Sequence, residues 1–274
     1  MFRMKRSTRW ASSVGVVVLF LVAAALPALP AEPPKSFWDW ATGPSIYDED
    51  GKRDWGVEVI PYLWLAGLSG EMALPGGGSF PVDASFSSLA DNLDAGFAGV
   101  LDLRYRRWHL ISDNSWVRLE FLAVPDQPAL TSAVLKPSIA FGTVGIAYEL
   151  PLQQSYAVDV YLAARWWHLA TEATITPVAG PTLAGSLSTA WADAVVGTRI
   201  RYSITDHWRV GAQADIGGGD ASLDWSVFAN VGYDFNRHVG MLVGYRVLGV
   251  DYRDAGFVYD VRQSGLLLGL TLRY

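Results

Sequence analysis

From residue 55 onward, apolar and polar positions alternate with the period of two that is typical of β-strands. In residues 266–274 one face is apolar and carries Leu266, Leu268, Leu270, Leu272 and Tyr274. The other face carries Gly269, Thr271 and Arg273. Residues 190–204, 208–216 and 223–235 repeat this arrangement. The pattern predicts strands that each have one apolar and one polar face.

The size of the apolar residues distinguishes a membrane barrel from a soluble sheet. A soluble core needs bulky side chains, but several positions on the apolar faces are alanines, at 190, 192, 194, 212 and 214. Lipid tails accept such small residues, so we expect the apolar faces to point outward and the polar faces to line a lumen. The sequence therefore predicts an all-β fold, a transmembrane antiparallel up-and-down β-barrel.

Short and long breaks between the strands follow one another in turn. The short breaks lie near 106–107, 151–155, 205–206 and 236–237, and the long ones near 74–94, 123–132, 177–187, 217–221 and 253–257. Four tight periplasmic turns and five outer loops predict ten strands, with eight as the alternative if two short segments are loops. The last strand is expected to close against the strand that begins at Trp55.

The first 31 residues are typical of a secretory signal peptide. Basic residues at 3, 5, 6 and 9 precede an apolar run over 14–26 and a small-residue exit, AALPALPA. Cleavage after Ala31 is favoured, with Ala25 and Ala28 as alternatives. Residues 32–54 are predicted to form a periplasmic N-terminal segment, and residues 55–274 the barrel. The predicted location is the cell outer membrane of a Gram-negative bacterium.

Composition and charge agree with an exported barrel. The chain has no cysteine, and its net charge of −6 becomes more negative when the basic leader is removed. Nucleic acid is therefore not an expected partner. The 12 Trp, 12 Tyr and 27 Gly suit strands and interfacial girdles better than helices. Outer-membrane lipid is the expected surrounding medium.

Five segments carry a family resemblance: residues 55–78, 85–105, 108–115, 244–252 and 259–274. With motifs such as SFSSLADNLDAGF and GYRVLGVDY, they resemble a group of uncharacterised proteobacterial outer-membrane β-barrel proteins. The resemblance covers roughly residues 54–274 and implies architecture but no chemistry. By resemblance to other barrels, Leu270, Leu272 and Tyr274 would form the signal read by the outer-membrane assembly machinery.

The alternation predicts a charged lumen in which six acids face six arginines. Arginine pairs well with carboxylates, so we expect a cross-lumen salt-bridge network. The inward-facing set is Glu58, Asp102, Arg104, Asp159, Arg165, Asp193, Arg199, Arg201, Arg209, Asp215, Asp234 and Arg246. Tyr161, Trp167 and Trp191 also point inward by phase and would narrow the lumen.

Aromatic residues gather at the strand ends beside the tight turns, where they predict a periplasmic girdle at the membrane interface. They are Tyr105, Trp108, Tyr148, Tyr156, Tyr202, Trp208, Tyr233, Phe235 and Tyr274. In 108–122 and 134–150 the apolar phase switches, near 112–114 and near 142–143. We interpret both switches as β-bulges, which reverse the facing of later side chains.

Candidate chemistry is sparse. His109, His207 and His238 lie beside tight turns and are predicted to be solvated or interfacial, whereas His168 is predicted to face lipid. A hydrolase would need a nucleophile or an acid near His168, and Asp220 and Asp260 have no assured proximity to it. No pair of histidines has metal-ligand spacing, so neither a metal nor a cofactor is expected.

These observations favour a structural or surface-interaction barrel with a largely filled lumen. Its loop 75–94, with a helical turn near 87–92, is the best candidate for contact with an unknown extracellular ligand. The first alternative is a narrow pore for small solutes, since ten strands lie near the filled end of the size range. An outer-membrane hydrolase is the less favoured alternative.

Overall fold

The computed structural model describes residues 55–123, 130–152 and 156–274. The predicted signal peptide, its cleavage site and the predicted N-terminal segment lie outside these ranges. Among the described residues, no helix is long and apolar enough to cross a bilayer.

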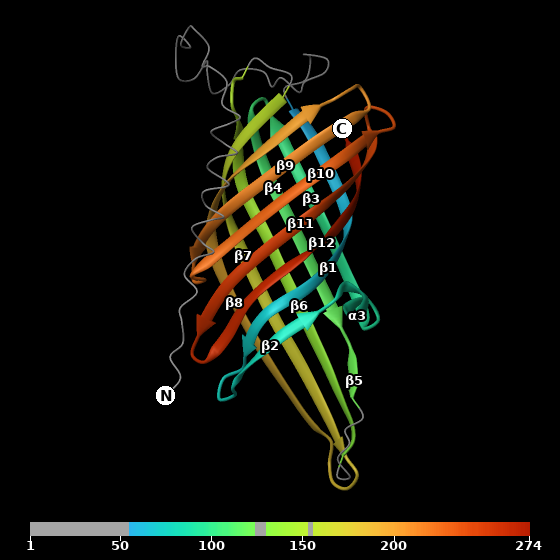
Figure 1. Cartoon of the computed structure of the whole chain (residues 1–274), viewed down its shortest axis with the longest axis vertical. Coiled ribbons are helices and arrows are strands. Elements are labelled where there is room, and N and C mark those ends of the chain that lie inside the picture. The colour runs from blue at the N-terminus through green and yellow to red at the C-terminus, as the bar shows by residue number, and fades with distance from the viewer. Residues whose placement is uncertain (1–54, 124–129, 153–155) are drawn as a thin grey trace.

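Ten antiparallel strands close into a barrel (Figure 1). They are β1 (Trp55–Ala73), β3 (Leu93–Tyr105), β4 (Trp108–Leu119), β6 (Leu130–Glu149), β7 (Tyr156–Pro177), β8 (Leu183–Ser203), β9 (Trp208–Gly219), β10 (Leu223–Asp234), β11 (Val239–Asp254) and β12 (Phe257–Arg273). Each strand pairs with the next, and β12 returns to pair with β1. The barrel class, the ten strands and the closure on the first strand are confirmed.

Pairing between the first and last strands continues to the final residue. Glu58 lies opposite Arg273. The backbone N–H groups of Tyr274 and Val57 each donate to the other's carbonyl oxygen at 2.9 Å. The sheet is thus a closed ring, and its backbone hydrogen-bonding groups are satisfied between strands, as a bilayer requires.

The two ends of the barrel differ in their connections. The four tight turns lie at one end, which we call the tight-turn end and which is uppermost in Figure 1. At the opposite end, the loop end, β6 and β7 extend far beyond the rest of the barrel. There β11 and β12 are joined by Ala255 and Gly256, both with positive φ, as a two-residue type I′ hairpin requires.

Three small elements lie at the loop end. Strand β2 (Ser79–Ala84) pairs with the outer part of β1, and β5 (Phe121–Ala123) pairs with β6. Helix α3 (Phe86–Ala90) begins after Ser85, whose Oγ accepts a hydrogen bond from the Ser88 N–H at 3.3 Å. The helical turn expected over 87–92 therefore lies slightly earlier, and β2 was not predicted from the sequence.

Apolar side chains cover the outside of the barrel. Along β12, Leu266, Leu268 and Leu270 are exposed, whereas the residues between them face inward and are buried or half-buried. Neighbouring strands present Leu63 and Val243 beside Leu268, and both are exposed. The outer surface therefore carries an apolar belt around the barrel, which a few polar residues interrupt.

The two predicted β-bulges are wrong. Strand β4 pairs with β3 and β6 in unbroken register through Ser112 and Asn114, and β6 pairs with β7 in unbroken register through Gly142. Ser112 and Asn114 therefore remain on the outer face, where the Asn114 amide donates to the Ser112 hydroxyl at 2.8 Å. The apolar residues that suggested a reversal, such as Phe141, face into an apolar part of the lumen.

Candidate functional site: the filled lumen

The twelve charged residues expected in the lumen all occupy inward-facing strand positions. Most of them meet in two groups, one at mid-lumen and one toward the tight-turn end. Two members stand apart from these ion pairs. Asp193 accepts a hydrogen bond from the Ala221 N–H at 2.8 Å, near the loop end. Arg104 lies beside Gly56 and, in the described part of the chain, forms no ion pair.

At mid-lumen, Arg165 is the centre of the first group. Its guanidinium donates to Asp215 at 2.9 Å, to Asp224 at 2.7 Å and to the Thr143 hydroxyl at 2.9 Å. Arg165 is 1% exposed. The Tyr161 hydroxyl also donates to Asp215, at 2.7 Å. Arginine is suited to this task because its planar fork serves several acceptors at once.

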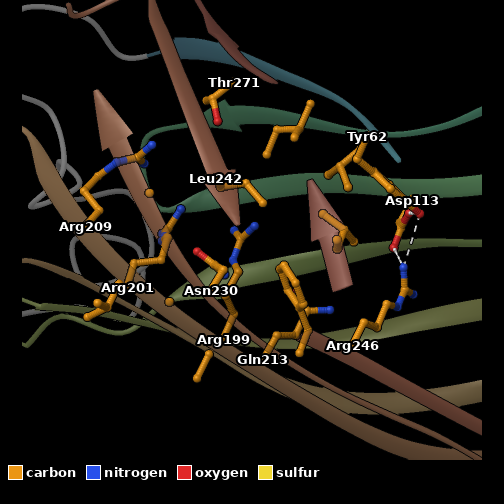
Figure 2. Close-up of a pocket in the computed structure, with 18 of the residues that line it drawn as sticks. Tyr62, Asp113, Arg199, Arg201, Arg209, Gln213, Asn230, Leu242, Arg246 and Thr271 are labelled. Atoms are coloured by element: carbon orange, nitrogen blue, oxygen red, sulfur yellow. Dashed lines mark hydrogen bonds and ion pairs between the residues drawn. The ribbon is translucent and has the colours of Figure 1, made fainter. Parts of the chain in front are cut away.

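A second mid-lumen pair lies across the barrel. Arg246 forms an ion pair with Asp113 at 2.8 Å, and the Tyr62 hydroxyl donates to the same carboxylate at 2.7 Å (Figure 2). The Arg246 guanidinium also lies 5.2 Å from the Trp64 ring and 5.6 Å from the Phe141 ring, within cation–π range. Arg246 thereby joins the charged region to the aromatic region beyond it.

Toward the tight-turn end, a second group joins four strands. Arg199 donates to Asp159 at 2.6 Å and to Asp102 at 2.7 Å. Arg201 donates to Asp159 at 3.0 Å and to Glu149 at 3.3 Å. These pairs link β3, β6, β7 and β8, so the lumen is cross-braced at this level.

Ion pairs at the same level also join strands around the seam of the barrel, where β12 pairs with β1. Arg209 pairs with Asp234 at 2.6 Å, and Arg273 pairs with that carboxylate at 3.0 Å. Arg273 also donates to Glu58 at 2.7 Å, which joins the last strand to the first.

An aromatic cluster fills the lumen beyond the charges, toward the loop end. Trp167 stacks on Trp191 with ring centroids 5.6 Å apart, and Trp191 stacks on Tyr252 at 4.1 Å. Phe141 and Tyr259 pack against the same stack. We call these five residues the aromatic plug. The Trp167 indole N–H donates to Asp224 at 2.9 Å, which ties the plug to Arg165.

Between these groups lies a cavity of about 130 Å³. Four arginines line it, Arg199, Arg201, Arg209 and Arg246, together with Glu58 and Asp113 (Figure 2). Gln213, Asn230 and Thr271 add polar groups to its wall. The cavity has room for a few water molecules or a small ion.

Several lumen groups were missing from the set inferred from sequence. Asp113 was missed because a bulge was assumed beside it, whereas Asp224 and Arg273 have the inward phase and could have been included. Glu149 lies at a strand end. His109 was predicted to be solvated or interfacial and is instead 3% exposed, because its position on β4 faces inward and its Nδ1 lies 2.7 Å from Asp102.

The remaining predicted positions lie as follows. Of the nine girdle aromatics, eight are exposed or half-exposed at the tight-turn end, while Tyr148 is 7% exposed and packs edge-on against Trp108. Leu270 and Tyr274 are exposed on the outer face, and Leu272 is half-exposed. His207 and His238 are exposed at the tight-turn end.

The candidates for hydrolysis are dispersed. His168 faces outward between Ala140 and Ala190 on the neighbouring strands. Asp260 forms an ion pair with Arg253 at 2.7 Å, and Asp220 accepts a hydrogen bond from the Ala192 N–H at 3.1 Å. These contacts do not bring either acid to His168.

No family model and no curated protein matches the chain. Among solved structures, it is similar to the outer membrane protease OmpT of Escherichia coli, with 10% identity over 80% of this chain and 96% of that one and a TM-score of 0.47. Neisserial surface protein A is 15% identical over 81% and 98%, with a TM-score of 0.29. Ail of Yersinia pestis is 12% identical over 81% and 99%, with a TM-score of 0.32.

Proposed function

We propose that this chain is an outer-membrane barrel with a sealed lumen, which acts as a structural or surface-interaction protein. The filled lumen is the observation that carries the proposal. Arg165 with its two carboxylates and the aromatic plug occupy successive levels of the same lumen. Ten strands leave little interior space to begin with. A barrel built in this way resists deformation but offers no open path.

The proposed location rests on the chain's own features. The leader is typical of secretion, the barrel surface carries an apolar belt, and aromatic residues ring the tight-turn end. The resemblance to a proteobacterial group of outer-membrane barrels supports the same location. Outer-membrane lipid and the barrel assembly machinery are the proposed partners, with Leu270, Leu272 and Tyr274 as the assembly signal.

Single-channel recording in planar bilayers tests the seal. We expect the refolded protein to give no discrete current steps, and the double variant Trp167→Ala/Trp191→Ala to give steps because the plug is removed. Trp166→Ala is the matched control, since Trp166 lies next along β7 but faces outward. Discrete steps from the unmodified protein would overturn the seal and favour the narrow pore.

The narrow pore remains the second candidate because of the arginine-lined cavity of about 130 Å³. A pore that uses it should prefer anions, since four arginines and two acids line the wall. A hydrolase has less support, because His168 faces outward and its candidate acids are engaged elsewhere.

Surface interaction is assigned to the loop between β1 and β3. Leu74, Phe80 and Phe86 are exposed there. Replacement of residues 75–92 by a glycine-serine linker should abolish surface binding of an extracellular ligand to intact cells without lowering the amount of folded barrel. Unchanged binding and unchanged envelope permeability would remove this loop from the proposal.

A further inference from the structure

His109 lies in the lumen near three carboxylates, and one of them holds its ring in a single orientation. Its Nδ1 lies 2.7 Å from Asp102 Oδ1. A carboxylate only accepts hydrogen bonds, so Nδ1 carries the proton and donates to it. In the neutral ring Nε2 is then an acceptor with a lone pair.

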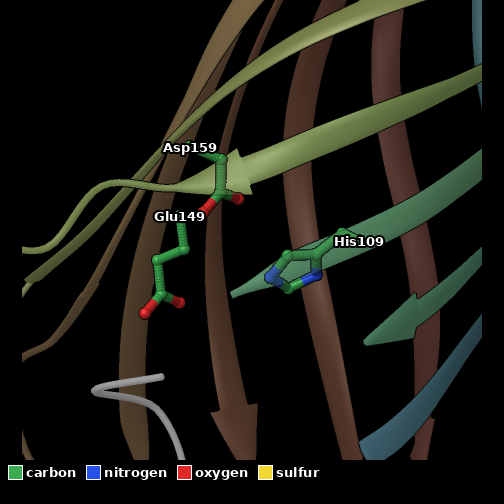
Figure 3. A group of neighbouring side chains, drawn as sticks. All are labelled: His109, Glu149 and Asp159. Carbon is green, nitrogen blue, oxygen red and sulfur yellow. The ribbon is translucent and has the colours of Figure 1, made fainter. Parts of the chain in front are cut away.

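That second ring nitrogen has no hydrogen-bond partner among the described residues, although the side chain is 3% exposed. Figure 3 shows it directed toward Glu149 and Asp159. A nitrogen of His109 and one oxygen from each of these carboxylates lie within 4.8 Å of one another. Buried polar atoms without a partner are rare in native folds, and each calls for a ligand, a water molecule or a chemical task.

The three groups are all acceptors, so their convergence is unfavourable unless something positive lies between them. Arg199 and Arg201 neutralise part of the charge by pairing with Asp159, and Arg201 also reaches Glu149. The unpartnered nitrogen of His109 and the two carboxylates nevertheless converge on one point.

We propose that His109, Glu149 and Asp159 form a binding site for a divalent transition-metal ion, best matched by Zn²⁺. One imidazole and two carboxylates are ligands that zinc accepts, whereas calcium and magnesium prefer all-oxygen sites. Neighbouring ligand atoms of a tetrahedral zinc ion lie about 3.4 Å apart, so the most widely separated of the three ligand atoms must approach each other by up to about 1.4 Å.

The surroundings supply the outer shell that such sites use. A metal-binding histidine commonly donates its other N–H to a carboxylate, which fixes the ring and raises its basicity. Asp102 has this position here. Arg199 joins Asp102 to Asp159, so the ligand Asp159 and the orienting Asp102 are held by one guanidinium. The site thus has three ligands and room in the coordination sphere for water.

Equilibrium dialysis of the refolded full chain against ZnCl₂, followed by metal analysis, tests the proposal. We expect one bound zinc per chain, and X-ray absorption with one nitrogen and additional oxygen ligands. His109→Gln should lose this zinc, and Asp102→Asn should weaken binding by about 10- to 100-fold because the ring loses its orientation. His207→Gln, which removes an exposed histidine at the same end, is the matched control and should bind normally.

Heat-modifiable migration on gels establishes that each variant is folded before binding is compared. If His109→Gln does not fold, zinc binding and X-ray absorption of the unmodified protein still test the proposal, because it requires one tightly held zinc with histidine coordination. Three outcomes would overturn it: no zinc retained by the unmodified protein, zinc lost equally in His207→Gln, or a proton alone at Nε2 with no metal at any concentration of ZnCl₂ that leaves the protein folded.

Discussion

Arg165 illustrates how a single residue can determine the stability of this lumen. It lies at the centre of two carboxylates, a threonine hydroxyl and, through Asp224, the indole of Trp167. A buried ion pair contributes little net free energy compared with an apolar replacement of both partners. Removal of one partner is different, since it leaves the other charge buried and unpaired.

We therefore predict that Arg165→Met lowers the free energy of unfolding by about 3–5 kcal/mol, because Asp215 and Asp224 lose their shared cation. Arg253→Met is the matched control. Arg253 also pairs with two carboxylates, but its side chain is 49% exposed, so the loss should be about 1 kcal/mol or less. Denaturant unfolding from lipid vesicles measures both. Equal losses would mean that the mid-lumen network does not brace the barrel.

At the scale of the strand, the alternation determines whether a side chain faces lipid or the lumen. The depth of a lipid-facing position in the bilayer determines how much a charge there would destabilise the barrel. Leu268 on β12 is 40% exposed on the outer face, next to exposed residues of β1 and β11. Leu272, on the same face of the same strand, lies near the tight-turn end. The same substitution can thus be compared at two depths of the apolar belt, because both positions are leucines on the outer face of β12.

We predict that Leu268→Arg lowers the free energy of unfolding by about 2–4 kcal/mol, and Leu272→Arg by about 0–1 kcal/mol, since the cost of a lipid-facing cation falls toward the interface. Unfolding from vesicles of defined thickness gives both values. If the substitution near the end were as costly as the one at mid-strand, the apolar belt would not follow the depth of the bilayer.

The strands show what the sequence could predict and what it could not. The regular alternation along 190–204 and 223–235 was sufficient to predict which side chains of β8 and β10 face the lumen and which face outward. It was misleading for β4, where the polar Ser112 and Asn114 lie on the outer face. It was also misleading for β6, where the apolar Ile139 and Phe141 face the lumen. The aromatic plug forms only when β6, β7, β8, β11 and β12 come together, so no single segment reveals it.

The candidate metal site was hidden for the same reason. His109 and Glu149 stand beside tight turns, where sequence suggests solvent. Glu149 and Asp159 face each other across one turn, but His109 is 40 residues or more from both along the chain and reaches them only when β4 pairs with β6. The inward phase of β4, extended to its first residues, would have placed His109 in the lumen.

At the scale of the molecule, the barrel closes within residues 55–274. Among the described residues, every strand pairing lies within this range, and the seam between β1 and β12 runs from the tight-turn end to the loop end. The lumen groups that brace the barrel also belong to this range. The closed sheet therefore contains the interactions on which we expect its stability to depend.

We predict that a chain of residues 55–274 refolds in detergent to a heat-modifiable barrel with the denaturation midpoint of the chain that begins at residue 32. Circular dichroism and gel migration measure the outcome. A large loss of midpoint in the shorter chain would show that residues 32–54 contribute to the barrel, which would contradict the proposed boundary.

The pair between Arg273 and Glu58 has a consequence for the order of assembly. These residues are 215 positions apart, and their contact exists only where the last strand meets the first. Until that moment both side chains need water, which the lumen of a half-formed barrel still admits. Closure then replaces part of this water, since the two side chains remain only 23% and 32% exposed, in the same step that pairs the backbones of β1 and β12. This ion pair can therefore form only at the step in which the barrel closes.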